Sequence, residues 1–429
     1  MKKFCIYFYL NKINLYSFKA LLSPLDKYID KLTNIDFFIH KKNLSIYDEI
    51  EELSKSYRKV IICFSIKSPE IFEYKILIKE LKKRYKEKII IICGGPHPSG
   101  LPKIMIKEGA DIVLIGESEE TFLKLLIALT NDYDLKNINS ICFKENDLII
   151  ETNKANYIDI NEFNSYSEKF NLYGPIEITR GCFYACSYCQ LNSLFGCRPR
   201  HRNLDNILKH VEVLKKYNLK DIRFITPSLF YYGTDNPKKI NLEIIEKLFY
   251  EIKKILGGDG RLFIGTFPSE VRPEHINNET IIIIKKYADN NNIIIGAQTG
   301  SERLLNFLNR KHSINDVINA VVLCKKNNII PKVDFIFGTP TETDTDTRDT
   351  LNLISYLVKL GAIIHAHYYI PLPNTKLFGL ESTKLTPETK KFLEDLTSKG
   401  FLYGNWKKQM LISKKLYQYY NNCLNETSY

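Results

Sequence analysis

Cysteines are the side chains in this sequence whose type and spacing most directly suggest chemistry. Three of them stand within eight residues, in the run Cys182-Phe-Tyr-Ala-Cys186-Ser-Tyr-Cys189. A short apolar stretch and Arg180-Gly181 precede the run, which predicts a loop at the carboxyl end of a strand. Three neighbouring thiolates can hold one metal centre, and they suit Zn²⁺ or an iron–sulfur cluster. On a four-iron cluster three ligands leave one iron open, and an open position is what metal chemistry requires.

Cys197 is the candidate for a fourth ligand, which would close the site. A closed centre is typical of structural zinc or of electron transfer, and it would make the chain a metal-stabilised binding protein rather than an enzyme. The spacing from Cys189 to Cys197 fits neither a Cys-x2-Cys knuckle nor the bacterial ferredoxin run. We therefore favour the open three-thiol centre and keep the closed site as an alternative.

The cysteine run opens the second of two regions in which strands and helices alternate. Six apolar runs of strand length are separated there by amphipathic stretches of helical length. These strands are expected at Ile176–Thr179, Ile222–Thr226, Leu262–Thr266, Ile293–Ala297, Val333–Phe337 and Ile363–Ile370. Six β/α units of this size predict a partial TIM-type barrel, whose active site forms from the loops at the carboxyl ends of the strands.

The Cys-x3-Cys-x2-Cys spacing, with the aromatic Tyr188 before the last cysteine, resembles the signature of the radical S-adenosylmethionine (SAM) superfamily. The resemblance implies that Cys182, Cys186 and Cys189 hold a [4Fe–4S] cluster. It also implies that SAM chelates the open iron through its amino and carboxylate groups, and that Tyr188 packs near the adenine. In that family, one electron delivered to the cluster cleaves SAM to methionine and a 5′-deoxyadenosyl radical.

Further segments resemble the radical SAM subgroup that includes the methylthiotransferases. They are Ile295–Glu302, Asn309–His312, Phe335–Thr343 and Ile370–Thr375. By this resemblance Gln298 and Gly338 belong to the SAM site, and Ser228 and Ser269, at the ends of the second and third strands, are placed to hydrogen-bond SAM. Thr226-Pro227-Ser228 stands where the family usually has Gly-Gly-Glu, so the backbone that meets the SAM amino group stays open.

The amino-terminal region alternates strands and helices in the same way and predicts a doubly wound, Rossmann-like parallel sheet. Its strands are expected at Lys3–Tyr9, Ile35–Ile39, Val60–Ser65, Ile89–Cys93 and Ile112–Ile115. Sheets of this kind bind ligands outside the carboxyl ends of their strands. Two glycine-containing loops stand at those ends, Cys93–Gly100 and Gly116–Thr121.

A doubly wound domain ahead of a radical SAM barrel resembles the cobalamin (B12)-binding class of the superfamily. The resemblance implies that loop residues surround the corrin ring, namely Ser65, Gly94, Gly95, Pro96, His97, Gly116, Glu117 and Glu119. Glycines let the backbone approach such a large flat ligand closely. The Asp-x-His-x-x-Gly motif of some cobalamin proteins is absent after the first strand, where Leu10–Asn14 stands, so no histidine lower ligand is expected there. A loop histidine hydrogen-bonded to backbone is the preferred interpretation of His97.

The expected organisation has four parts. A cobalamin-binding-like domain covers residues 1–135, a β excursion and connector 136–173, the radical SAM barrel 174–380, and a helical segment 381–429. Hydrophobic residues make up 44% and charged residues 26% of the chain, which excludes global disorder. No run approaches the ~18 apolar residues that a membrane span needs. Ten cysteines without regular pairing in so long a chain indicate reduced thiols and a cytoplasmic protein.

The net charge of +12 permits an anionic partner such as nucleic acid. The lysines are scattered among acidic residues, however, which favours a solvated surface. We therefore expect a cobalamin-dependent radical SAM enzyme that methylates or rearranges an unactivated carbon of an unidentified substrate. The resemblance implies a low-potential electron donor such as a ferredoxin or flavodoxin.

The basic charge and the segment Gln298–Arg310 also suggest an alternative, a tRNA methylthiotransferase. The resemblance to that family implies a second cluster on three amino-terminal cysteines, for which Cys5, Cys63 and Cys93 are the candidates. Cys5 and Cys63 lie inside apolar strand patterns, which favours core thiols instead.

Overall fold

A computed structural model describes residues 4–41, 43–237 and 239–425 of the chain. The chain divides into two compact units. The first runs to Tyr173 and includes Ser193–Phe195, and the second comprises Gly174–Asn192 and the chain from Gly196. No helix among the described residues combines the length and the apolar character needed to cross a membrane.

The first unit is built around a seven-stranded sheet with the order β2-β1-β3-β4-β5-β6-β7. Its strands are β1 (Phe4–Phe8), β2 (Ile35–Ile39), β3 (Lys59–Ser65), β4 (Ile89–Gly94), β5 (Ile112–Leu114), β6 (Ile141–Glu145) and β7 (Leu148–Glu151). The first five strands are parallel, and β6 and β7 form an antiparallel hairpin at the β5 edge. The order 2-1-3-4-5 is doubly wound, so ligands are expected outside the carboxyl ends of the strands, near the switch between β1 and β3.

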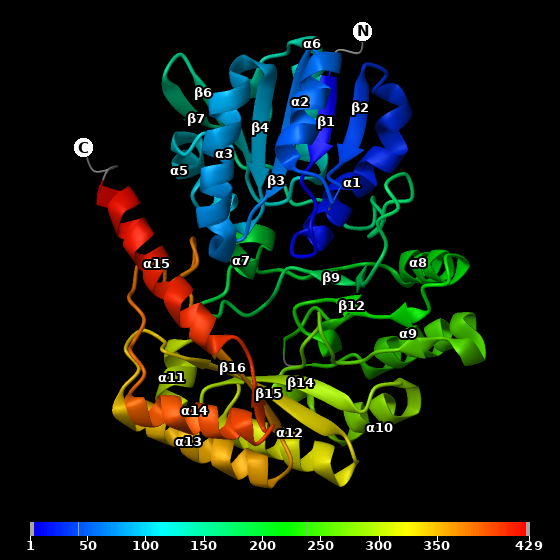
Figure 1. The fold of residues 1–429 in the computed structure, drawn as a ribbon. Helices are drawn as coiled ribbons and strands as arrows, with labels where there is room; N and C mark the ends of the chain where they lie inside the picture. The colour runs from blue at the N-terminus through cyan, green and yellow to red at the C-terminus, as the bar shows by residue number, and fades with distance from the viewer. Residues whose placement is uncertain (1–3, 42, 238, 426–429) are drawn as a thin grey trace. The chain divides into compact units, whose positions relative to one another are not determined.

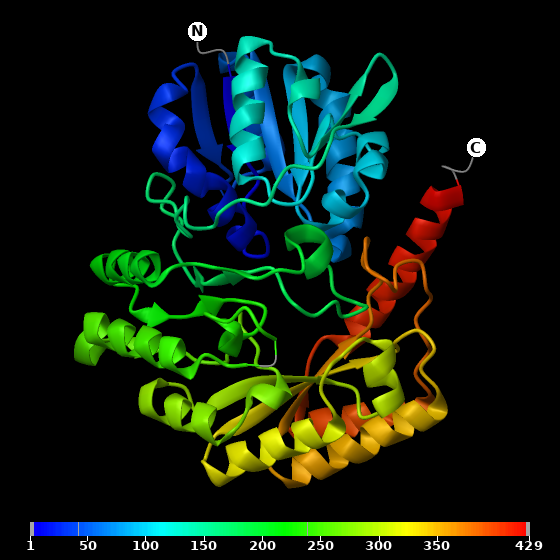
Figure 2. The same ribbon diagram turned by 180° about the vertical axis from the view of Figure 1, so that it is seen from behind.

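Helices cover both faces of this sheet. They are α1 (Leu15–Tyr28), α2 (Ile46–Ser56), α3 (Ile71–Tyr85), α4 (Pro96–Gly100), α5 (Pro102–Lys107) and α6 (Glu119–Asn131). Helices α2 and α3 lie on one face, and α1 and α6 on the other (Figures 1 and 2). Phe8 of β1 packs edge-on against Phe18 of α1 and Phe122 of α6. Burial on both faces explains why these strands are continuous apolar runs.

The expected α/β class of this unit is confirmed, but two details differ. The segment expected as a β excursion supplies β6 and β7 of the same sheet, so the sheet is mostly rather than wholly parallel. Pro96–Gly100, expected as part of a loop, forms the short helix α4. Gly95 turns the chain with a φ of 94°, and Pro96 has the preset φ that favours the first helical position.

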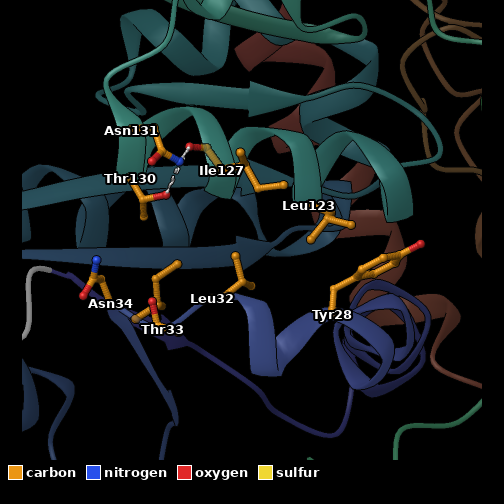
Figure 3. Close-up of a pocket in the computed structure, with 9 residues that line it drawn as sticks. Tyr28, Leu32, Thr33, Asn34, Leu123, Ile127, Thr130 and Asn131 are labelled. Atoms are coloured by element: carbon orange, nitrogen blue, oxygen red, sulfur yellow. Dashed lines mark hydrogen bonds between the residues drawn. The ribbon is translucent and has the colours of Figure 1, made fainter.

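A cavity of about 280 Å³ lies at the amino end of β2 in this unit (Figure 3). It is lined by Leu32–Ile35, which lead into the amino end of β2, and by Leu123, Ile127 and Asn131 of α6. Helices in βα units run back toward the amino ends of the strands, so this cavity does not share the edge at which the glycine loops stand.

The second unit contains a parallel sheet that is regular only in its later half. Strands β14 (Asn292–Gln298), β15 (Ile330–Phe337), β16 (Ile363–Tyr368) and β17 (Leu402–Tyr403) form one four-stranded sheet. The earlier strands have two residues each: β8 (Ile176–Glu177), β9 (Thr179–Arg180), β10 (Arg200–His201), β11 (Asp221–Ile222), β12 (Phe224–Ile225) and β13 (Arg261–Leu262). Parallel pairs β8–β12 and β11–β13 and parallel bridges Thr226–Ser269 and Val271–Ile295 connect these pieces in chain order toward β14. This is the arrangement of an open barrel.

Helices follow the strands as in other β/α barrels. They are α7 (Leu191–Phe195), α8 (Leu204–Lys216), α9 (Leu242–Leu256), α10 (Asn278–Tyr287), α11 (Glu302–Phe307), α12 (Ile314–Lys326), α13 (Asp344–Lys359), α14 (Pro387–Ser398) and α15 (Trp406–Asn425). Helices α12, α13 and α14 lie along one side of the four-stranded sheet (Figure 1). The segment expected to be wholly helical also contains β17, which extends this sheet by pairing parallel with β16.

Candidate functional site

The cysteine run forms a loop between β9 and α7. Gly181 turns the chain out of β9 with a φ of 86°. Backbone hydrogen bonds then hold the loop: Cys182 N donates to Gly196 O at 3.3 Å, and Cys189 N donates to Cys186 O at 3.0 Å. All three thiols are half-buried. The loop therefore gathers three sulfurs that keep some accessible surface at the carboxyl end of the first barrel strand.

The three thiols lie in one electrostatic neighbourhood. Burial raises the pKa of Cys182, and the neighbouring Cys186 raises it further. Burial also raises the pKa of Cys189 to about 12, and the other two thiols add to this rise. The Arg310 guanidinium donates to Cys186 Sγ at 3.7 Å. Thiols with raised pKa values stay protonated at neutral pH, so a metal that binds here has to displace their protons.

The described sulfurs are spaced more widely than a single zinc ion requires. Two thiolates bound to one zinc ion at about 2.3 Å would stand about 3.8 Å apart. Among the described residues, the one group of three ligating side chains whose atoms all lie within 4.8 Å is Asp334, His365 and His367, and not the cysteines. The wider set of thiols suits ligands that each bind a different iron of one cluster.

Cys197, the candidate fourth ligand, stands apart from this set. Its side chain is exposed. Within the described chain, it is not among the largest causes that shift the pKa of Cys182 or Cys189. The alternative of a closed four-cysteine centre therefore has no support in the geometry.

The three candidates for a second cluster are core thiols. Cys5, Cys63 and Cys93 are buried on β1, β3 and β4. Burial raises the pKa of each of them. The strand register sets Cys63 beside Phe8 and Cys93 beside Phe64. A cluster at these positions would have to displace the centre of the sheet.

Two buried hydroxyls stand at the ends of the second and third barrel strands. Ser228 and Ser269 are 1% and 2% exposed. Neither hydroxyl has a hydrogen-bond partner among the described residues. Unpaired buried polar atoms are destabilising unless a ligand or water pairs with them. Both hydroxyls therefore fit a polar ligand of the kind that SAM is.

Gln298 ends β14 in a strained backbone conformation. Its φ is 76°, a region that non-glycine residues rarely adopt, and a bulge separates it from Gly296 in the pairing with β15. Its side chain folds back over Gly296, where an added Cβ would lie 2.7 Å from Gln298 Nε2. The Gln298 amide is therefore held over the inner side of the strand, where it could meet a ligand.

Gly338 has a structural explanation of its own. Its φ is 70°, and an added Cβ would lie 2.3 Å from Cε2 of Tyr368 and 2.9 Å from Thr383 O. The glycine is thus required by packing against Tyr368. Its predicted place in the SAM site stays a prediction.

Tyr188 packs in a small apolar cluster beside the cysteines. The cluster contains Leu308, Tyr369, Leu377 and, partly buried, Ile336. The Tyr188 hydroxyl accepts a hydrogen bond from Arg310 Nη1 at 3.3 Å. Arg310 Nη2 also donates to Gly296 O at 2.6 Å, so this guanidinium connects the cysteine loop to β14.

Sequence reasoning missed several polar residues inside the barrel. Glu270 keeps an exposed side chain, yet burial is the largest cause that raises its pKa to about 7, with Asp334 as the next cause. Accessible surface combined with strong desolvation describes a carboxyl group in a deep recess. Asp334, His365 and His367 lie next to one another on β15 and β16. The two histidines are two residues apart in an expected strand, a spacing that signals a shared polar face, whereas nothing in the sequence around Glu270 marks it.

The candidate cobalamin residues of the first unit stand at three neighbouring strand ends. Ser65 ends β3 and pairs in register with Gly94, which ends β4. An added Cβ at Gly95 would lie 3.0 Å from the Ile66 backbone and from Ser65 Oγ. Gly116 follows β5 with a φ of 73°, and its N donates to Ser99 Oγ at 2.9 Å. Packing against Ile66 and Ser65 thus accounts for Gly95 within the unit, and the place of these residues around cobalamin stays a prediction.

The charged and aromatic candidates of these loops form hydrogen bonds within the first unit. Glu117 Oε2 accepts from Ile158 N at 3.0 Å, and Glu119 Oε2 accepts from Ser118 N at 3.1 Å. His97 is fully buried, and its Nδ1 lies 3.0 Å from Ser68 Oγ. The expected bond from His97 to backbone is thus replaced by one to a serine side chain. The predicted cobalamin contacts of Glu117, Glu119 and His97 stay predictions.

Comparisons with known families assign both units. Residues 6–126 match the B12 binding domain, and residues 176–354 match the radical SAM superfamily. An uncharacterized methyltransferase of Pyrococcus horikoshii is 24% identical over 77% of this chain and 71% of its own length. A tRNA-2-methylthio-N(6)-dimethylallyladenosine synthase of Pseudothermotoga lettingae is 29% identical over 64% of this chain and 58% of its own.

The fold also has a solved counterpart. The radical S-adenosylmethionine methyltransferase TsrM from Kitasatospora setae, a structure with cobalamin and a [4Fe–4S] cluster bound, aligns with a TM-score of 0.67. The alignment covers 88% of this chain and 77% of TsrM at 16% sequence identity. The aligned part includes residues of both units.

Proposed function

Because the chain belongs to the radical SAM superfamily and carries an N-terminal B12-binding domain, we propose that it transfers a methyl group to an unactivated carbon of its substrate. It is a cobalamin-dependent radical SAM enzyme, and the cofactors of this class are a [4Fe–4S] cluster, SAM and cobalamin. The observation that carries the proposal is the set of three half-buried thiols on one loop, while Cys197 is exposed.

The chemistry of the candidate residues indicates which cofactor each of them would bind. Cys182, Cys186 and Cys189 would hold the cluster. Ser228 and Ser269, whose hydroxyls lack partners among the described residues, would bind polar groups of SAM together with the Gln298 amide. The backbone around Gly94–Gly95 and Gly116, with Ser65, would face cobalamin. When bound, the reduced cluster supplies the electron that cleaves SAM, and cobalamin supplies the methyl group.

Side chains around the cysteine loop offset the charge of the thiolates and exclude water from the loop. The three thiolates of the loop carry negative charge, and the Arg310 guanidinium 3.7 Å from Cys186 Sγ offsets part of it. The apolar cluster around Tyr188, Leu308 and Tyr369 limits water beside the loop. A dry site protects reactive species from side reactions. No pair of side chains is needed here as acid and base, and we assign none.

Methyl transfer, rather than rearrangement, is supported by the names of similar proteins. The relative from Pyrococcus horikoshii is called a methyltransferase, and TsrM is a methyltransferase. Radical SAM enzymes need a reductant, and we propose a low-potential donor such as a ferredoxin or flavodoxin. A methylthiotransferase-like reaction is less well supported, because its second cluster would fall on the core thiols Cys5, Cys63 and Cys93.

The test needs no knowledge of the substrate. The protein is reconstituted anaerobically with iron, sulfide and hydroxocobalamin, desalted, and treated with a reductant and SAM that carries a CD₃ methyl group. We expect about four irons per chain, as one [4Fe–4S] cluster requires, and bound cobalamin in the absorption spectrum. We also expect CD₃-labelled methylcobalamin and S-adenosylhomocysteine by mass spectrometry, and 5′-deoxyadenosine as the mark of radical cleavage.

Two matched cysteine variants sharpen the test. Cys186→Ala should lose the cluster absorbance and the production of 5′-deoxyadenosine, while Cys197→Ala should keep both. Equal loss in Cys197→Ala would support the closed centre and refute the open one. About eight irons per chain would favour the methylthiotransferase alternative. Cleavage of SAM without any labelled methylcobalamin would contradict methyl transfer.

A further inference from the structure

Two neighbouring barrel strands bring three ligating side chains together. Asp334 of β15 stands in register with His365 of β16, and His367 lies two residues further on the same face of β16. Strand alternation therefore places all three side chains on one side of the sheet. Their ligating atoms all lie within 4.8 Å of one another, and no other group of this kind occurs in the described part of the chain.

The distances within this triad are those of ligands around one cation. His365 Nδ1 lies 3.0 Å from Asp334 Oδ1 and 3.1 Å from His367 Nε2. With metal–ligand bonds of about 2.1 Å, two ligands at 90° stand about 3.0 Å apart and two ligands at 109° about 3.4 Å apart. The observed separations match adjacent ligands of an octahedral or slightly compressed tetrahedral centre.

Hydrogen bonding alone does not satisfy these atoms. His365 Nδ1 faces two partners, but an imidazole nitrogen has only one proton or one lone pair to offer. One shared proton could serve both partners only through a bent three-centre bond. A cation placed among the three would instead accept a lone pair from each. Gln409 Nε2 lies 3.4 Å from His367 Nδ1, a long hydrogen bond that leaves Nε2 of the same ring to face His365.

The charge balance points the same way. Asp334 is 4% exposed, and in the described chain His365 is its one ion-pair partner. Glu270 brings a second carboxyl group near Asp334, and Arg310 and His365 are the basic groups that act on it. The nearby guanidinium of Arg310 donates to Gly296 O at 2.6 Å. Buried carboxylates normally pair with a cation or bind a metal.

The surroundings hold the triad in place. The Tyr403 ring stacks on His365 with a centroid distance of 4.4 Å and an interplanar angle of 5°. Both histidines are half-buried, so they are covered without being sealed off. Such supporting contacts fix the orientation of ligand rings and are a regular part of metal sites.

We propose that Asp334, His365 and His367 form a binding site for one divalent transition-metal ion inside the barrel, separate from the cysteine loop. Two imidazoles and one carboxylate suit Zn²⁺, Fe²⁺ or Co²⁺, and they leave coordination positions open for water or a substrate oxygen. Such an ion would give the barrel a fixed positive centre to anchor an anionic or chelating substrate group. The site is independent of the cluster and of the methyl transfer proposed above.

Zn²⁺ is the probe for the test. The reconstituted holoenzyme is dialysed to equilibrium against micromolar Zn²⁺, and bound zinc is measured by mass spectrometry. We expect about one zinc per chain, and His365→Ala and His367→Ala should each weaken binding at least about 100-fold, since even outer-shell partners are worth about 10- to 100-fold. His40→Ala is the matched control, because His40 pairs with the Glu49 carboxylate at 2.6 Å but belongs to no described group of three ligating side chains. It should bind zinc as the unmodified protein does.

X-ray absorption at the zinc edge decides the matter even if a variant fails to fold. In the unmodified holoenzyme we expect nitrogen and oxygen neighbours at about 2.0–2.1 Å with imidazole scattering. Sulfur neighbours at about 2.3 Å would place the zinc on cysteines and overturn the proposal. The absence of stoichiometric zinc would overturn it as well, and so would zinc binding by both histidine variants that equals binding by the unmodified protein.

Discussion

His97 offers a test that separates a structural histidine from a cobalt ligand. Burial lowers its pKa to about 3, compared with about 6.5 in an unfolded chain. The unfolded state therefore binds more protons below pH 6.5, so the stability contribution is complete above that pH and is lost as the pH falls toward 3. Linkage gives a loss of about 2 kcal/mol between pH 7.5 and pH 5, from RT ln(1 + 10^1.5).

Hydrogen exchange read by mass spectrometry can measure this loss in the first unit alone. The peptides that cover β3 and β4 report the opening free energy of the sheet beneath His97. In the cobalamin-free protein, we expect their protection to fall about 30-fold more between pH 7.5 and pH 5 than in His97→Gln, after correction for intrinsic exchange. His40→Gln, a variant of a less buried histidine of the same unit, should keep the steeper dependence.

The same variant tests the role in cofactor binding. Because His97 is fully buried and lies 3.0 Å from Ser68 Oγ, His97→Gln should bind hydroxocobalamin with an unchanged absorption spectrum. Two results together would refute the reasoning: a pH dependence of protection equal to that of the unmodified protein, and a spectrum altered at the cobalt. They would show that the ring leaves the core to ligate the metal.

Two further predictions concern the second unit. Gly338→Ala should lower the melting temperature far more than Gly379→Ala. Both positions have positive φ, but only at Gly338 would an added Cβ collide with the Tyr368 ring. Melting temperatures that fall by the same amount in both variants would contradict this. Burial alone would raise the pKa of Asp346, but bonds from Arg303 and neighbouring hydroxyls hold it well below its usual range. The stabilisation by the Asp346 carboxylate is therefore present above about pH 4 and lost in acid. Asp346→Asn should reduce the free energy of unfolding by about 1–2 kcal/mol at pH 7. In urea titrations, its free energy of unfolding should fall less steeply toward pH 2 than that of the unmodified protein.

The first unit could be predicted closely because its strands are buried on both faces. Continuous apolar runs gave Ile35–Ile39 and nearly the bounds of β3 and β4. The helix Pro96–Gly100 was hidden, since a proline–glycine run usually signals a loop. Its backbone follows the preset φ of Pro96 instead. The hairpin of β6 and β7 was visible as strands, but its attachment to the β5 edge is a long-range pairing that local pattern does not contain.

The second unit was less predictable in its first half. The run Ile222–Thr226 breaks into two-residue strands, and half-buried Arg223, which lies over the Phe263 ring, interrupts the apolar pattern. The cysteine loop was fully visible, because its chemistry resides in residue type and spacing. The carboxyl of Glu270 was not, because the groups that set its pKa, Asp334, Arg310 and His365, are distant in sequence.

The strands of the two units carry different burial patterns, and the difference has a functional meaning. In β3 every residue from Val60 to Ser65 is buried, which describes a sheet packed on both faces. In β16 buried Ile364, Ala366 and Tyr368 alternate with half-buried His365 and His367. Helix α13 lies along the outside of this sheet (Figure 1). Apolar side chains of a barrel strand pack against such helices, which leaves the polar side for the inside of the barrel. A barrel filled only by its own side chains would need apolar residues there. Polar alternation in a strand that helices cover on its other side therefore indicates a lumen kept for ligands, because polar side chains facing a closed apolar core would be destabilising.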